Sequence, residues 1–167
     1  VWLLQHSFFF FDISEFAVPF RHIASQALAQ GRFPLWTNQV LNGYPLFAEG
    51  QAGVLFPLHY VFYPFLPTPA AFNATMLLVF FVIIGFSFGF FRQFCSRPAA
   101  MVGAVLFTGS GAIVTRHFHM PVLNALAAFC ALLFIWERFQ RRPSAWRFAL
   151  ACLTMATLHF AGHPQFT

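Results

Sequence analysis

The acidic side chains of this chain are concentrated in one polar segment near its beginning. Three of the four carboxylates, those of Asp12, Glu15 and Glu49, fall between Asp12 and Pro57. Asp12 directly follows a run of phenylalanines, and a carboxylate so close to hydrocarbon is costly unless it has a function or a partner. We therefore expect Asp12 to be a catalytic or substrate-binding carboxylate. The alternative is a helix cap completed by Glu15, which Pro19 disfavours because its ring and its missing N–H interrupt a helix.

The composition indicates that this segment belongs to an integral membrane protein. Hydrophobic residues make up 59% of the 167 residues, charged residues only 8%, and the mean hydropathy is +0.70. A soluble domain carries about 25% charged residues. The gaps between charged residues can each hold the roughly 17 to 25 apolar residues that cross a bilayer. They predict transmembrane helices over residues 70–94, 98–115, 121–139 and 145–161.

The expected fold class is therefore an all-α integral membrane protein, a polytopic bundle of transmembrane helices. Residues 1–11 are too short to cross a bilayer alone, and we interpret them as the end of a truncated first helix. Residues 12–69 then form a large first loop. Further helices are expected after the last predicted span, so the chain is expected to be a fragment of one transmembrane domain.

Arginine placement predicts which side of the membrane each loop occupies. The joint after the first complete span carries Arg92 and Arg97, and the joint before the last span carries four more arginines, whereas the turn between them holds only Arg116. Short loops rich in arginine stay in the cytoplasm. The loop 12–69 and the ends 116–121 and 162–165 are then extracytoplasmic. All the histidines then lie at or near that face: His6, His22, His59, His117, His119, His159 and His163.

Nucleic-acid binding and metal binding are not favoured. Six of the nine arginines flank the ends of spans, where they meet anionic lipid headgroups, and no basic run remains for nucleic acid. No cofactor is expected. A divalent metal site stays open but is not favoured, because His117 and His119 are two residues apart and a helix would point them about 200° from one another. Only an extended turn would bring both to one ion.

The first part of the loop predicts a helix over residues 19–30. This segment places apolar side chains such as Phe20 and Ala24 on one face, with Arg21 and His22 elsewhere, and a glycine follows as a stop signal. The pattern is typical of an interfacial helix that lies along the membrane surface. Packing of the helix against the other spans is the alternative.

The rest of the loop predicts turns and extended backbone. Proline or glycine stands beside an aromatic residue in three motifs, at 32–36, 42–45 and 53–57. Such backbone must lie above the hydrocarbon or line a wet cavity. Trp36 and Tyr44 are candidate platforms for stacking on a sugar, and an interfacial position is the more common alternative.

An ordered set of these motifs resembles one family. Asp12 is followed by Pro-Phe-Arg at 19–21, G-R-F-P-L-W at 31–36, N-G-Y-P-L at 42–46, Gln51 and F-P-L at 56–58, and G-H-P-Q follows a later predicted span at 162–165. In this order the chain resembles the N-terminal part of the bacterial YfhO-type membrane proteins, relatives of the GT-C glycosyltransferases. It departs from the family pattern at 36–38, where Trp-Thr-Asn replaces Trp-Asn-Pro.

The resemblance implies a multi-pass enzyme of the bacterial plasma membrane that moves a sugar from a polyprenyl-phosphate donor to an extracytoplasmic cell-envelope glycan or polymer. Asp12 matches the family's acidic residue and would act as general base on the acceptor hydroxyl. The leaving phosphate needs donors, and Arg116 is the first choice because arginine binds phosphate in a bidentate manner. The full set of expected substrate-binding residues is Glu15, Arg21, His22, Trp36, Tyr44, Gln51, Arg116, His117, His119 and His163.

A non-enzymatic role is the competing hypothesis. A lipid or polymer flippase, or an envelope assembly scaffold, would need no general base at position 12. Transporters commonly carry broken helices and charges in the middle of the membrane. The predicted spans hold only mild polar residues such as Asn73 and Asn124, which favours the enzyme.

Overall fold

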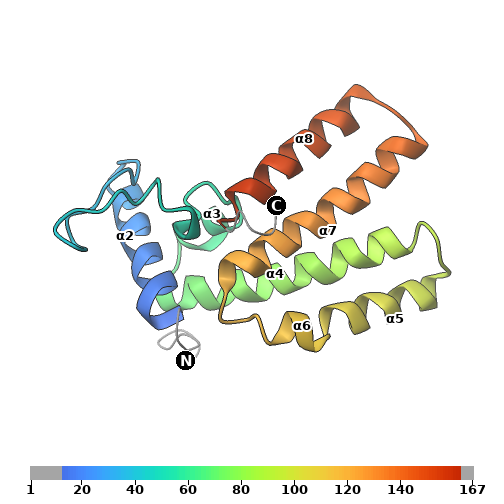
Figure 1. Ribbon diagram of the computed structural model, residues 1–167, viewed down its shortest axis with the longest axis horizontal. Coiled ribbons are helices and arrows are strands. Elements are labelled where there is room, and N and C mark those ends of the chain that lie inside the picture. Colours follow the sequence, from blue (N-terminus) through green and yellow to red (C-terminus); the bar gives the residue numbers. More distant parts are fainter. Residues whose placement is uncertain (1–12, 163–167) are drawn as a thin grey trace.

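A helical bundle with a smaller, loop-rich part at one end makes up the described chain (Figure 1). The computed structural model describes residues 13–162. The bundle contains α4 (Thr68–Phe91), α5 (Arg97–Thr108), the short α6 (Gly111–Val114), α7 (Met120–Arg141) and α8 (Ala145–Phe160). The loop-rich part contains η1 (Ile13–Ala17), α2 (Val18–Ala29), η2 (Gly50–Ala52) and α3 (His59–Phe62).

Helices α4 and α7 are the two long helices, and they pack side by side. Each has a proline in its first turn, where the missing N–H costs no helical hydrogen bond. Val79 and Ile83 of α4 and Leu123 of α7 are fully buried in their shared core. The C-terminal ends of the two helices also meet, because the Gln93 side-chain amide donates to the carbonyl oxygen of Phe134 at 3.4 Å.

Among the described residues, α4 and α7 are the only helices that are both long enough and apolar enough to cross a membrane. The predicted span at 98–115 is interrupted, because α5 ends at Thr108 and Ser110 is extended before α6 begins. The 12 residues of α5 rise only about 18 Å, against a hydrocarbon core of about 30 Å. The 16 residues of α8 rise about 24 Å and are also too few.

The polytopic fold class expected from the sequence is therefore wrong. Residues 13–162 do not form a GT-C-like bundle with four complete spans. They form a helical structure in which two helices are long and apolar enough to span a membrane. The error arises from measuring the distance between charged residues, because that distance ignores uncharged helix breaks such as Gly109 and Ser110. The described residues form helices and loops, with one isolated β-bridge between Thr37 and Tyr44.

The exposure of α4 favours contact with lipid. Only 28% of the most apolar stretch of α4 is buried, against 61% for α7. Phe81 of α4 is 70% exposed, whereas the core helix of a soluble protein buries such side chains. The outer face of α4 is thus an apolar surface of the kind that meets a membrane or a partner.

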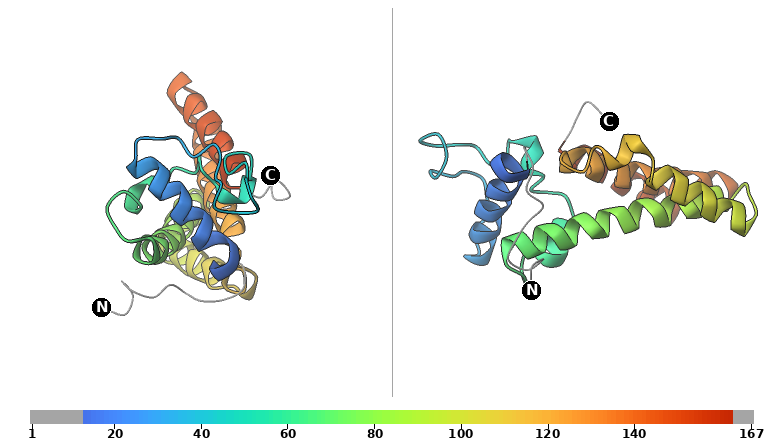
Figure 2. Two further views of the ribbon diagram at one scale, coloured as in Figure 1. Left: turned by 90° about the vertical axis from the view of Figure 1, so that its left-hand side faces the viewer. Right: turned by 90° about the horizontal axis from the view of Figure 1, so that it is seen from below.

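The loop-rich part covers one end of α4, and α2 lies across the axis of that helix (Figure 2). A helix is present where residues 19–30 predict one, since α2 runs from Val18 to Ala29. Phe20 and Ala24 of α2 pack with Leu46 and Val54 of the loop. This small apolar cluster fixes α2 against the loop that follows it.

The loop also closes on the end of α8. Gly162 has a φ of +94°, and a Cβ added there would lie 2.1 Å from the carbonyl oxygen of Gly50. Only glycine satisfies both the conformation and the space at this position. The contact brings the C-terminal end of α8 to the same end of the bundle as the loop.

A pair of glycines in α4 tests the packing of α4 on α7. A Cβ added at Gly89 would lie 2.9 Å from Cε2 of Phe134, whereas one added at Gly85 would meet nothing within 4 Å. Alanine favours a helix over glycine by up to about 1 kcal/mol. Gly85→Ala should raise the thermal unfolding midpoint of the detergent-solubilised protein, and Gly89→Ala should lower it. Equal stabilisation by both substitutions would contradict the packing of Phe134 on Gly89.

Candidate functional site

Arg21 of α2 is a buried cation at the junction between the loop and the bundle. Its side chain is only 5% exposed, although the helical pattern separates it from the apolar face. The end of η2 and the start of α3 contact it from the side that the pattern leaves polar. Arg21 forms no ion pair with any residue in 13–162. Among these residues, the hydrogen-bond partners of its guanidinium are neutral groups.

Two neutral acceptors hold the guanidinium. Nη1 of Arg21 donates to the carbonyl oxygen of Ala52 and lies 2.7 Å from Nδ1 of His59. The carbonyl oxygen of Gly53 also lies 2.9 Å from Nδ1 of His59. Nδ1 cannot both accept a hydrogen bond from Arg21 and donate one to Gly53. A hydrogen bond from a charged group is the stronger of the two, so Nδ1 accepts. The ring proton of His59 is then on Nε2.

The other side of the His59 ring contacts α7. Nε2 lies 3.4 Å from the side-chain amide of Asn124, which is fully buried. Because Nε2 carries the proton, the amide oxygen of Asn124 must face it, an orientation that the hydrogen-bond network decides. In the opposite orientation that oxygen has no partner among the described residues. Arg21, His59 and Asn124 thus connect α2, α3 and α7.

Burial sets the protonation state of each group in this network. Desolvation lowers the pKa of Arg21 to about 10, so Arg21 remains charged at neutral pH. Desolvation and then the charge of Arg21 lower the pKa of His59 well below its usual value of 6.5, so His59 is neutral. Burial raises the pKa of Tyr63 to about 12 and also raises that of Tyr60. Of these four side chains, only Arg21 is charged.

The network forms one wall of a cavity of about 220 Å³ between α2 and α3. The polar wall is made by Arg21, His59, Tyr60 and Tyr63, and the apolar wall by residues that include Ala24, Leu28 and Val54. No described residue accepts a hydrogen bond from Nη2 or Nε of Arg21. These donors suit the oxygens of an anion, and the apolar wall suits a hydrocarbon group on the same ligand.

Gly53 lets the loop approach this network closely. It has a φ of +54°, and a Cβ added there would lie 3.0 Å from Nη2 of Arg21 and 3.1 Å from Cε1 of His59. A larger residue would therefore be strained and would push against both side chains. The Gly-Pro-aromatic motif at 53–57 shapes the cavity through its backbone.

Arg21 is the one predicted site residue within 13–162 that lines this cavity. Asp12 and His163 lie outside the described residues. Glu15 and Gln51 are exposed. His22 faces α4 instead, because its Nδ1 lies 2.8 Å from Oγ1 of Thr68.

The two predicted stacking residues have different surroundings. Trp36 is 59% exposed and lines a second cavity of about 480 Å³ beside α2, where its indole N–H donates to Oδ1 of Asn38 at 2.8 Å. Tyr44 is covered by Phe20, with ring centroids 5.4 Å apart. Its hydroxyl donates to Glu49, and this hydrogen bond is the main reason that the pKa of Tyr44 is raised. The Trp36 side chain is therefore largely open to solvent, whereas one face of the Tyr44 ring is stacked on Phe20.

The residues expected to bind phosphate at the turn before α7 do not reach the Arg21 cavity. Arg116 is exposed, Nδ1 of His117 donates to the carbonyl oxygen of Val114 at 2.9 Å, and His119 directly precedes α7. The turn nevertheless lies at the loop end of the bundle, because Asn124 in the first turns of α7 contacts His59.

Sequence reasoning missed most of this network. His59 appeared only as one of seven histidines, and Asn124 only as a mild polar residue within a span. The signal that points to them is Arg21 itself, because an arginine next to an apolar helical face must find polar partners if it is buried. Asn124 is a polar residue near the start of an apolar helix, and such residues commonly hydrogen bond to a neighbouring element.

Within residues 13–162, no group of three or more His, Cys, Asp or Glu side chains could hold a metal ion. Comparison with known protein families, curated proteins and solved structures gives no match for the chain. The resemblance to the YfhO-type proteins therefore stays a prediction. The geometry of the Arg21 cavity is what bears on function.

The neutral state of His59 predicts a loss of stability on acidification. In the unfolded chain a histidine binds a proton below about pH 6.5, whereas the pKa of His59 in the folded protein is well below that value. The unfolded state then binds more protons, so the free energy of unfolding falls below about pH 6.5, by up to about 1.4 kcal/mol per pH unit. Thermal unfolding of the detergent-solubilised protein between about pH 7.5 and 5 measures this slope.

A histidine pair provides the control for this prediction. His59→Gln removes the titration and keeps a hydrogen-bonding side chain, so it should flatten the pH dependence. His22→Gln changes an exposed histidine of α2 and should retain the wild-type slope. A wild-type slope in His59→Gln would show that His59 is not buried in its neutral form.

Proposed function

We propose that the protein is a membrane-associated glycosyltransferase that moves a sugar from a polyprenyl-phosphate donor to an extracytoplasmic cell-envelope acceptor. The observation that carries the proposal is the buried guanidinium of Arg21, which faces a cavity with one polar and one apolar wall and which no described carboxylate neutralises. A polyprenyl phosphate has the matching chemistry, an anionic head on a hydrocarbon tail. The resemblance to the YfhO-type proteins implies the bacterial plasma membrane, and the arginine pattern favours an extracytoplasmic position for the loop.

The position of the cavity supports this ligand. His22 of α2 contacts Thr68, the first residue of α4, and α4 is long and apolar enough to cross a membrane. The cavity therefore lies near one end of a helix of membrane-spanning length. When such a helix crosses the bilayer, its ends lie at the depth of the headgroups, which is where the phosphate of a lipid-linked donor is found.

The proposed reaction needs a general base and a site for the leaving phosphate. Asp12 takes the proton of the acceptor hydroxyl while that oxygen bonds to the anomeric carbon of the donor sugar. The bond between the anomeric carbon and the phosphate oxygen breaks, and polyprenyl phosphate leaves with an added negative charge. Arg21 stabilises this charge strongly, because electrostatic attraction is greater at a site that excludes water.

Trp36 supplies a surface for a sugar ring. Its exposed indole lines the cavity on the other side of α2, and its hydrogen bond to Asn38 fixes the ring plane. Pyranose rings present C–H groups that pack on aromatic faces, and the rigid indole binds them at a low cost in conformational entropy. We assign this cavity to a sugar of the acceptor polymer that lies away from the hydroxyl that reacts.

Arg21→Lys tests the phosphate site. Lysine retains the positive charge but loses the planar fork of N–H donors. The KM for the donor should rise by about tenfold or more, as expected for loss of a hydrogen bond to a charged group. Transfer rates in proteoliposomes with a panel of polyprenyl-phosphate sugars measure this. Arg97→Lys, at an exposed arginine far from the cavity, is the control, and a wild-type KM in Arg21→Lys would contradict the assignment.

Asp12→Asn tests the general base separately. The carboxamide is similar in size but cannot take a proton at neutral pH, so kcat should fall by roughly 10² to 10⁴. Binding of polyprenyl phosphate should be unchanged, which distinguishes loss of the base from misfolding. Transfer at the wild-type rate by a normally inserted Asp12→Asn protein would exclude this role.

A further inference from the structure

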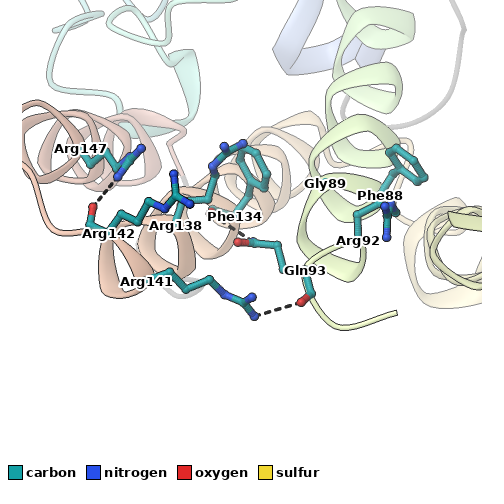
Figure 3. A pocket seen from close by; sticks show the side chains of 9 residues that line it. All are labelled: Phe88, Gly89, Arg92, Gln93, Phe134, Arg138, Arg141, Arg142 and Arg147. Carbon is teal, nitrogen blue, oxygen red and sulfur yellow. Dashed lines mark hydrogen bonds between the residues drawn. The ribbon is translucent and has the colours of Figure 1, made fainter. Parts of the chain in front are cut away.

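A second concentration of positive charge lies at the far end of the bundle, where α4 and α7 end and α8 begins (Figure 3). Five of the nine basic residues of the chain, all arginines, line a cavity of about 530 Å³ at this place: Arg92, Arg138, Arg141, Arg142 and Arg147. We call it the arginine cavity. It is separate from the Arg21 cavity and does not depend on the proposed transferase activity.

The charge of the arginine cavity is largely uncompensated. Within the described chain one carboxylate pairs with these arginines, that of Glu137, which accepts a hydrogen bond from Nε of Arg141 at 2.8 Å. Arg147 donates to the carbonyl oxygen of Arg142, a neutral partner that removes no charge. Four of the five guanidinium groups are thus without a carboxylate partner among residues 13–162.

Arg138 and Arg142 have the most donors available for a ligand. Neither guanidinium donates a hydrogen bond to a residue of the described chain, and that of Arg138 lies 5.3 Å from the centroid of the Phe134 ring, which orients it. Figure 3 shows the two side chains next to each other on one side of the cavity. Paired guanidinium groups bind the oxygens of a phosphate in a bidentate manner.

The arginine cavity lies where phospholipid headgroups meet a membrane-spanning helix. Helices α4 and α7, which among residues 13–162 are the two that are long and apolar enough to cross a membrane, end at it. Trp146, at the start of α8, is 74% exposed, and tryptophan is enriched at the depth of the headgroups. Phe88 and Phe134 line the cavity beside the arginines and offer apolar surface to the carbons that adjoin a lipid phosphate.

We propose that the arginine cavity binds the headgroup of an anionic phospholipid, with Arg138 and Arg142 contacting its phosphate. Negative charge distinguishes this lipid from zwitterionic phospholipids, which carry a compensating cation. Basic cavities between membrane helices are suited to such headgroups. The bound lipid would neutralise the arginines that the protein itself leaves unpaired.

The test is a lipid titration of the full chain in detergent, followed by native mass spectrometry. Phosphatidylglycerol should bind more tightly than phosphatidylcholine. The double variant Arg138→Gln/Arg142→Gln should lose this preference, because the affinity for phosphatidylglycerol falls about fivefold for each arginine removed. The control Arg32→Gln/Arg97→Gln removes the same charge outside the arginine cavity, with Arg97 at the same end of the bundle, and should keep the preference.

Several outcomes would overturn the proposal. They are equal binding of the two lipids by the wild-type protein, an equal loss in the control variant, or a wild-type preference in Arg138→Gln/Arg142→Gln. Glycerol 3-phosphate should compete poorly, and competition as strong as that of phosphatidylglycerol would indicate a site for free anions instead. Arg138→Lys/Arg142→Lys should recover part of the preference, which separates loss of charge from loss of fold.

Discussion

The desolvation of Arg21 is the constraint on which the arrangement of the loop end depends. Removing a charged group from water costs several kcal/mol unless hydrogen bonds replace the lost water. Here the carbonyl oxygen of Ala52 and Nδ1 of His59 replace it. This requirement fixes the tautomer of His59, and the tautomer in turn fixes the orientation of the side-chain amide of Asn124 on α7. One buried charge thus decides how α2, the loop, α3 and α7 fit together.

The two ends of the bundle use arginine in opposite ways. At the loop end a single guanidinium is buried, with a lowered pKa that still leaves it charged, beside a small cavity with apolar and polar walls. At the far end five exposed or half-exposed arginines surround a larger cavity. Helices α4 and α7 connect the ends and are long enough to cross a membrane. The two cationic sites thus lie at opposite ends of helices that are long and apolar enough to cross a membrane.

Some features could be predicted from the sequence because local pattern determines them. The helix at α2, the two long apolar helices and the turns at the proline and glycine motifs follow from spacing and from residue type. The break at Gly109 and Ser110 could not be predicted from the spacing of charges, because the segment around it is uncharged and apolar. Arg21 and His59 are in contact although they are 38 positions apart, and His59 and Asn124 although they are 65 positions apart. No local pattern specifies such contacts.

The central claim is that Arg21 binds the phosphate of an anionic lipid. The change in thermal unfolding midpoint when the lipid is added tests this claim most directly. Polyprenyl phosphate that binds the folded protein alone should raise its thermal unfolding midpoint, with a stabilisation of about 2.7 kcal/mol at a concentration 100 times the Kd. Polyprenol, which lacks the phosphate, should have little effect. In Arg21→Gln the shift caused by polyprenyl phosphate should disappear. An equal shift in the wild-type protein and in Arg21→Gln, or an equal effect of polyprenol, would contradict the account.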